Sequence, residues 1–185
     1  MTPEKESIRE MFERKEREFM LARSRVRMKA SVENLEAGEY RIDSLAEGQS
    51  VELPRWIADE LIELKLAESQ EERFEDELSR ALSREKMMGP LQLSSLPPDF
   101  YMRMRRRIAS LASGLGSTKK EDFDKMKIAC YDLIGMRLSK LLSLSSSSSQ
   151  GSSLTDRLAP EEEAFFSVSQ ALSVEWRAAL LEGST

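Results

Sequence analysis

The chain of 185 residues contains no histidine and only one cysteine, Cys130. Without histidine, the sequence lacks the most common general base, the most common metal ligand and every Ser-His or Cys-His catalytic pair. A single cysteine excludes an internal disulfide framework and a cysteine-based zinc cluster. The sequence also has no phosphate-binding loop and no dinucleotide-binding fingerprint. We therefore expect a protein that is not an enzyme and that has no catalytic residues, no cofactor and no metal site.

Aromatic residues are scarce as well, at 6 % of the chain, while leucine and methionine are frequent. This balance favours packed helices over sheets. No apolar run approaches the roughly 18 residues of a membrane-spanning helix, and the N-terminal MTPEKESIRE lacks the apolar segment of a secretory signal. We expect an intracellular protein without membrane contact. The net charge of −5 argues against a generic nucleic-acid coat, although it leaves room for a local basic face.

The period of the apolar residues changes along the chain and indicates three segments. Residues 1–24 have the pattern of an exposed N-terminal helix, which is either solvated or an arm that contacts a partner. Residues 25–67 show period-two alternation, with Val26 and Met28 on one side of a first strand, and predict a small β-rich domain. Residues 68–185 predict a helical bundle. The fold class expected is mainly α with a small β-rich domain.

The stretch from Leu53 to Trp56 leads an extended chain directly into a helix, because proline suits the first helical turn. Three strands as short as those expected here, near residues 26–30, 40–42 and 51–53, are not stable alone. The helix that begins at Pro54 must therefore cover their apolar face. On this helix Trp56, Ile57, Leu61 and Leu64 fall at helical spacing. The candidates for domain packing or an interface here are Leu53, Pro54, Trp56 and Leu61.

Four amphipathic helices are expected in the second segment. Ser69 and Glu72 have the spacing of a capping box, which places the start of the first helix there. The others are expected to begin near residues 98, 119 and 160, and the long third helix to end near residue 144. The serine-rich stretch 143–153 predicts a flexible loop. The expected core residues are Phe74, Leu78, Ala81, Leu82, Phe100, Tyr101, Met104, Ile108, Leu111, Phe123, Met126, Cys130, Leu133, Ile134, Leu138, Leu141, Phe165, Val168, Leu172, Trp176 and Ala179.

The densest basic cluster follows Phe100 and Tyr101 on one expected helix. Arg103, Arg106 and Arg107 share a side of that helix, while Arg105 points elsewhere. Three interpretations stay open: salt bridges with acidic neighbours, an interface with another subunit, or contact with nucleic acid. The acidic runs 71–77 and 161–163 lie near helix starts, where they complement the helix dipole, and nothing in the sequence gathers them into a metal site.

Three pieces of the chain together resemble the GINS family of small replication subunits. They are LPRWIADELIELKLAE over residues 53–68, SLPPDFYMRMRRRI over 95–108 and, more weakly, LAPEEEAFF over 158–166. With the spacing between them, the resemblance covers residues 25–181. The order of domains, with the small β-rich one first, is that of one archaeal subunit type. The N-terminal helix departs from the family pattern, in which such subunits usually begin near the first strand.

The resemblance implies a non-enzymatic subunit that assembles with other GINS subunits into a homo- or heterotetramer through its helical domain. It further implies that the tetramer docks on the MCM replicative helicase together with a RecJ-like partner of the DHH family. Such a protein would be cytoplasmic and nucleoid-associated in an archaeon, or nuclear in a eukaryote. The alternative is a helical regulator that binds nucleic acid through the Arg103–Arg107 helix.

Overall fold

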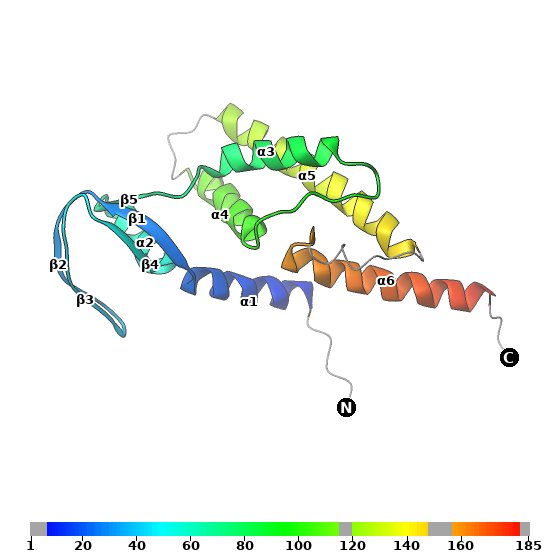
Figure 1. The fold of residues 1–185 in the computed structure, drawn as a ribbon, viewed down its shortest axis with the longest axis horizontal. Coiled ribbons are helices and arrows are strands. Elements are labelled where there is room, and N and C mark those ends of the chain that lie inside the picture. The colour runs from blue at the N-terminus through cyan, green and yellow to red at the C-terminus, as the bar shows by residue number, and fades with distance from the viewer. Residues whose placement is uncertain (1–6, 115–119, 148–156, 182–185) are drawn as a thin grey trace. The chain divides into compact units, whose positions relative to one another are not determined.

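The computed structural model describes residues 7–114, 120–147 and 157–181, and it divides the chain into two compact units, residues 1–73 and 74–185. The first unit holds a three-stranded antiparallel sheet in the order β4-β1-β5 (Figure 1). Its strands are β1 (Arg23–Met28), β4 (Ser50–Pro54) and β5 (Ala67–Ser69). In β1, Val26 and Met28 are buried, as their alternation with charged residues predicts.

Helix α2 (Arg55–Glu63) begins directly after β4, and its apolar side packs in one cluster with residues of this sheet. The helix was predicted to cover strands near residues 26–30, 40–42 and 51–53, but the second of these does not belong to the sheet. Ile57 and Leu61 on α2 are each 2 % exposed and join the same apolar cluster as Val26 and Leu53. Leu64 was expected on this buried side, but the helix ends there and the side chain is 57 % exposed. One short helix therefore buries the apolar face of three strands that are too short to be stable alone.

Strands β2 (Val32–Ala37) and β3 (Tyr40–Leu45) form a separate hairpin (Figure 1). Gly38, with φ of 61°, is the first residue of a two-residue turn, a position where a hairpin favours glycine. Of these strands, only β3 was predicted from the sequence, whereas β2 and the short β5 were not. Several apolar side chains of the hairpin are half-buried against the cluster beneath α2: Val32, Leu35, Ala37 and Ile42.

Helix α1 (Ile8–Leu21) belongs to the first unit and is held there by Arg55 at the start of α2. The Arg55 guanidinium lies 4.1 Å from the centroid of the Phe19 ring on α1. The same guanidinium donates two hydrogen bonds of 2.9 and 2.7 Å to the Glu71 carboxylate. Glu71 also accepts a 3.0 Å hydrogen bond from Ser24 on β1. The first unit therefore extends to Arg73, beyond the boundary expected at residue 67.

Trp56 is half-buried on α2, and its ring meets the Tyr40 ring edge-on at 6.1 Å between centroids. Because the ring is only partly buried, we expect Trp56→Ala to lower the stability of the first unit by about 2–3 kcal/mol, below the usual loss for a core tryptophan. Amide hydrogen exchange of Val26 and Met28 should become faster, while that of Leu133 in the second unit stays unchanged. Equal acceleration in both units would show that they do not fold independently.

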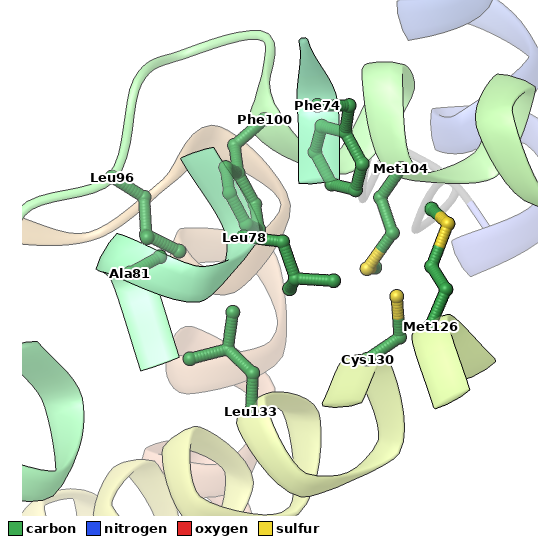
Figure 2. Packing of buried hydrophobic residues seen from close by; sticks show 9 residues of the cluster. All are labelled: Phe74, Leu78, Ala81, Leu96, Phe100, Met104, Met126, Cys130 and Leu133. Atoms are coloured by element: carbon green, nitrogen blue, oxygen red, sulfur yellow. The ribbon is translucent and has the colours of Figure 1, made fainter. Parts of the chain in front are cut away.

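The second unit consists of α3 (Phe74–Met87), α4 (Phe100–Ala112), α5 (Lys120–Ser146) and α6 (Pro160–Leu181). α3, α4 and α5 meet around Phe100, which is fully buried, with the Phe74 ring 5.2 Å away (Figure 2). A second apolar cluster joins α5, α6 and the segment after α3. Its buried members are Leu93, Leu141, Leu144 and Phe166. The fold class expected from the sequence, α+β with a helical bundle, is confirmed.

Several boundaries differ from those expected. α3 begins at Phe74, and Ser69 lies in β5, where its hydroxyl accepts a hydrogen bond from the Glu71 N–H. The expected capping box was therefore wrong. α5 continues to Ser146, into the stretch expected to be a flexible loop; residues 148–153 of that stretch lie outside the described part. Within the described residues, no helix is long and apolar enough to cross a membrane.

Candidate assembly interface

A buried cluster of charged residues holds the helices of the second unit together, and Arg137 of α5 lies at its centre. Arg137 is 1 % exposed, yet all five of its N–H donors have acceptors. Nε and one terminal nitrogen bind the two oxygens of Glu162 on α6, at 2.5 and 2.6 Å. The other terminal nitrogen donates to Glu85 of α3 and to the Ser94 carbonyl, each at 2.8 Å. The fifth bond reaches the Arg157 carbonyl at 3.3 Å.

Glu85 is the second charged residue at the centre of this cluster. Its carboxylate accepts hydrogen bonds from the Ser94 N–H at 3.0 Å, the Ser94 hydroxyl at 2.6 Å and Lys140 at 2.7 Å. Burial by itself would raise the pKa of Glu85, but the hydrogen bonds from Lys140 and Ser94 and the charge of Arg137 hold this pKa below its usual value. Glu85 is thus a carboxylate, and two cations balance Glu85 and Glu162.

Tyr101 and Ala159 complete the cluster. The Tyr101 hydroxyl donates a 2.6 Å hydrogen bond to Glu162, and both burial and the charge of Glu162 raise the pKa of Tyr101. The Ala159 N–H donates to Glu162 at 2.9 Å and so satisfies a donor at the start of α6. Through these contacts α3, α4, α5 and α6 are fixed to one another at one buried point. The outward faces of α5 and α6 are consequently held in a defined arrangement.

One outward face of α5 is apolar and exposed. Ile128 and Tyr131 are 61 % and 66 % exposed, and Leu142 is 48 % exposed. Ile134 and Leu138 were expected in the core, but they too lie on this outer face, at 36 % and 40 % exposure. α5 therefore has two apolar sides, one in the core of the bundle and one open. We call the open side the α5 stripe, and it consists of Ile128, Tyr131, Ile134, Leu138 and Leu142.

α6 also carries an exposed apolar row. Phe165 is half-buried, but Val168, Leu172 and Trp176, all expected in the core, are 47 %, 64 % and 65 % exposed. Ala179, expected with them, is exposed as well. We call Val168, Leu172, Trp176 and Ala179 the α6 stripe. Contiguous exposed apolar faces of this kind mark sites of protein association.

The basic residues of α4 bind acidic residues at the start of α3. Arg103 forms a 2.5 Å ion pair with Glu77, and Arg107 binds Glu75 at 2.8 and 2.5 Å. Arg106 is half-buried on the same helix, and Arg105 is exposed. Arg103 and Arg107 are therefore engaged inside the unit, which corresponds to the first of the three interpretations of this cluster.

The remaining candidates from the sequence lie in the two cores. Leu53, Pro54 and Leu61 are buried in the first unit, with Trp56 half-buried beside them. Phe100 is buried in the second unit, and Tyr101 belongs to the charged cluster. Cys130 is buried in the same core, and burial raises the pKa of its thiol to about 11, which is unsuitable for a nucleophile. Among the described residues, no three acidic or cysteine side chains are placed to hold a metal ion.

A helical bundle with a rigid charged centre and two open apolar faces defines a protein-association module. The family model of the GINS complex protein helical bundle domain matches residues 60–181. The chain therefore belongs to the GINS family of DNA replication complex subunits, as its resemblance over residues 53–68, 95–108 and 158–166 predicted. No individual curated protein matches the chain.

Proposed function

We propose that this chain is a non-enzymatic subunit of a tetrameric GINS-like complex that docks on the MCM replicative helicase and activates it together with a RecJ-like partner. The observation that carries the proposal is the pair of exposed apolar stripes on α5 and α6, within the family's helical domain. A lone bundle of this size leaves these side chains in water, whereas assembly with other GINS subunits would bury them.

The interaction is proposed to be protein–protein. The chain carries 28 basic and 33 acidic residues, so no excess of positive charge attracts nucleic acid. Arg103 and Arg107, the residues that suggested a nucleic-acid reader, are engaged with Glu77 and Glu75. A weak DNA contact stays compatible with the assembly but would not be its main interaction. We propose a location beside the replicating chromosome, in the cytoplasm of an archaeon or the nucleus of a eukaryote.

The proposal predicts that the purified chain raises the unwinding rate of an MCM helicase from its own source when a RecJ-like partner is present. The chain alone should hydrolyse neither ATP nor nucleic acid, because it has no histidine and no phosphate-binding loop. Unwinding of a labelled forked DNA measures the effect, with and without the chain.

The variant Leu172→Glu introduces a charge into the α6 stripe and should no longer stimulate the helicase. Stimulation that survives without any assembly would contradict the proposal. Tight, salt-sensitive binding of the chain to free DNA, with no effect on the helicase, would instead favour the nucleic-acid regulator.

A further inference from the structure

The α5 stripe contains a glycine at the centre of a long helix. Gly135 lies within α5, which runs without interruption from Lys120 to Ser146. Glycine lowers the stability of a helix interior relative to alanine. A Cβ atom built at Gly135 would meet nothing within 4 Å, so the packing of the chain itself does not require a glycine there. A close approach from outside the chain would require it.

The residues around Gly135 follow the spacing of a coiled-coil seam. Ile128, Tyr131, Gly135, Leu138 and Leu142 are separated alternately by three and four positions. The four apolar side chains in this row are between 40 % and 66 % exposed. Lys127 lies beside the row, with its ammonium 5.9 Å from the centroid of the Tyr131 ring. This row therefore has the spacing of one side of a helix pair, and the missing side chain of Gly135 leaves a gap at its centre.

A second copy of the same helix complements this row when it runs antiparallel. In an antiparallel pair, the two rows coincide only when a residue that begins a three-residue interval faces a residue that ends one. One such register sets Leu138 of each copy against Gly135 of the other and Tyr131 against Leu142. The leucine then fills the hollow that the glycine leaves, and the exposed Asp132 faces the uncharged Ser139. The patch is complementary to itself, as a two-fold interface requires.

Two other pairings of α5 helices are less favourable. In one antiparallel register shifted by one heptad, Asp132 faces Asp132 and Leu142 faces Asp124, so like charges meet and an aspartate borders the seam. In a parallel pair, Gly135 faces Gly135 and leaves an unfilled gap at the centre, which costs packing contacts.

We propose that α5 pairs antiparallel with α5 of a second copy of this chain, with Leu138 of each copy seated on Gly135 of the other. The inference rests on the proposed function, since it names which surface and which partner form one contact of the assembly. It goes beyond that function because it names Gly135 as the residue on which the packing of the two α5 helices depends. The contact is the same whether the complete assembly contains one kind of subunit or two.

The first test is Gly135→Leu in the full chain, compared with Ser143→Leu. Position 135 is open in the single chain, so the substitution should leave the helical content and unfolding temperature unchanged or higher. It should raise the dissociation constant for self-association at least about tenfold, measured by analytical ultracentrifugation, because the leucine fills the hollow needed by Leu138. Ser143 is exposed and lies roughly 80° around the helix from Gly135, so Ser143→Leu should change nothing.

The second test fixes the direction of the pair. Chains carrying Tyr131→Cys are mixed with chains carrying Leu142→Cys and oxidised. A disulfide between the two kinds of chain is expected only in the mixture, because in the proposed register identical positions lie about 16 Å apart along the axis. The unaltered chain, whose one thiol is the buried Cys130, is the control for background oxidation.

Cross-links within each kind of chain alone would indicate a parallel pair and overturn the proposal. So would unchanged or tighter self-association of Gly135→Leu. A chain that is a monomer by itself yet joins a different GINS subunit would overturn this inference and leave the proposed function standing. A chain that assembles with no GINS subunit at all would contradict the proposed function.

Discussion

Replacing Arg137 by methionine is expected to destabilise the helical unit by about 3–5 kcal/mol, the usual loss when one partner of a buried ion pair is removed. Methionine keeps much of the volume of the side chain, so the loss would come from the charges and hydrogen bonds. Glu85 would keep Lys140 as a counter-charge at 2.7 Å. Among the described residues, Glu162 would keep only the neutral hydrogen bonds from Tyr101 and Ala159. Urea unfolding followed by helical circular dichroism measures the change.

A second substitution separates the charge effect from a packing defect. Adding Glu162→Gln to Arg137→Met removes the uncompensated carboxylate, so part of the lost stability should return. The surface control is Arg84→Met on α3, which is exposed and should change the free energy of unfolding by less than about 0.5 kcal/mol. A loss below about 1 kcal/mol for Arg137→Met would show that the charged cluster contributes little to holding the helices together.

The periodicity of the apolar residues predicted much of the fold. The alternation at Val26 and Met28 identified β1, and the spacing of Phe74, Leu78 and Ala81 identified α3 and its buried side. These signals are strong because each element packs one side on its own core. β2 was missed because VENLEA contains several charged and exposed residues and pairs only with β3, in a hairpin separate from the three-stranded sheet. β5 was missed because three residues are too few to show a period.

The charged centre of the bundle was missed for a different reason. Arg137 and Glu85 were not included in the expected core, yet Arg137 follows Cys130 and Leu133 on the buried side of α5, and Glu85 follows Leu78 and Ala81 on α3. The signal available in the sequence was a charged residue at core spacing on each of two expected helices, Arg137 on one and Glu85 on the other. Which oppositely charged residues meet depends on how the helices pack, and the spacing within one helix does not contain that information.

The exposed stripes show a related limit. Leu138 on α5, and Leu172 and Trp176 on α6, have helical spacing and were assigned to the core for that reason. Spacing identifies an apolar side but not the molecule against which it packs. In a subunit built for assembly, the same pattern describes a side buried in its own bundle and a side left for another chain.

Introducing a charge into the α6 stripe is therefore expected to break the assembly without unfolding the chain. Leu172 is 64 % exposed, so Leu172→Glu should change the free energy of unfolding of the single chain by less than about 0.5 kcal/mol. In an assembled interface, the same carboxylate would be desolvated without a partner, at a cost of several kcal/mol per copy. Light scattering should show that species larger than a dimer of the 21.1 kDa chain are lost.

The neighbouring substitution Ala171→Glu makes the comparison specific. It adds the same charge to an exposed position one residue away, which lies roughly 100° around α6 from Leu172. If the α6 stripe is the interface, Ala171→Glu should assemble as the unaltered chain does, while Leu172→Glu should not. Equal assembly of the two variants would place the contact elsewhere. Equal loss would mean that the added charge itself, rather than its position on the stripe, opposes association, because both variants carry the same net charge.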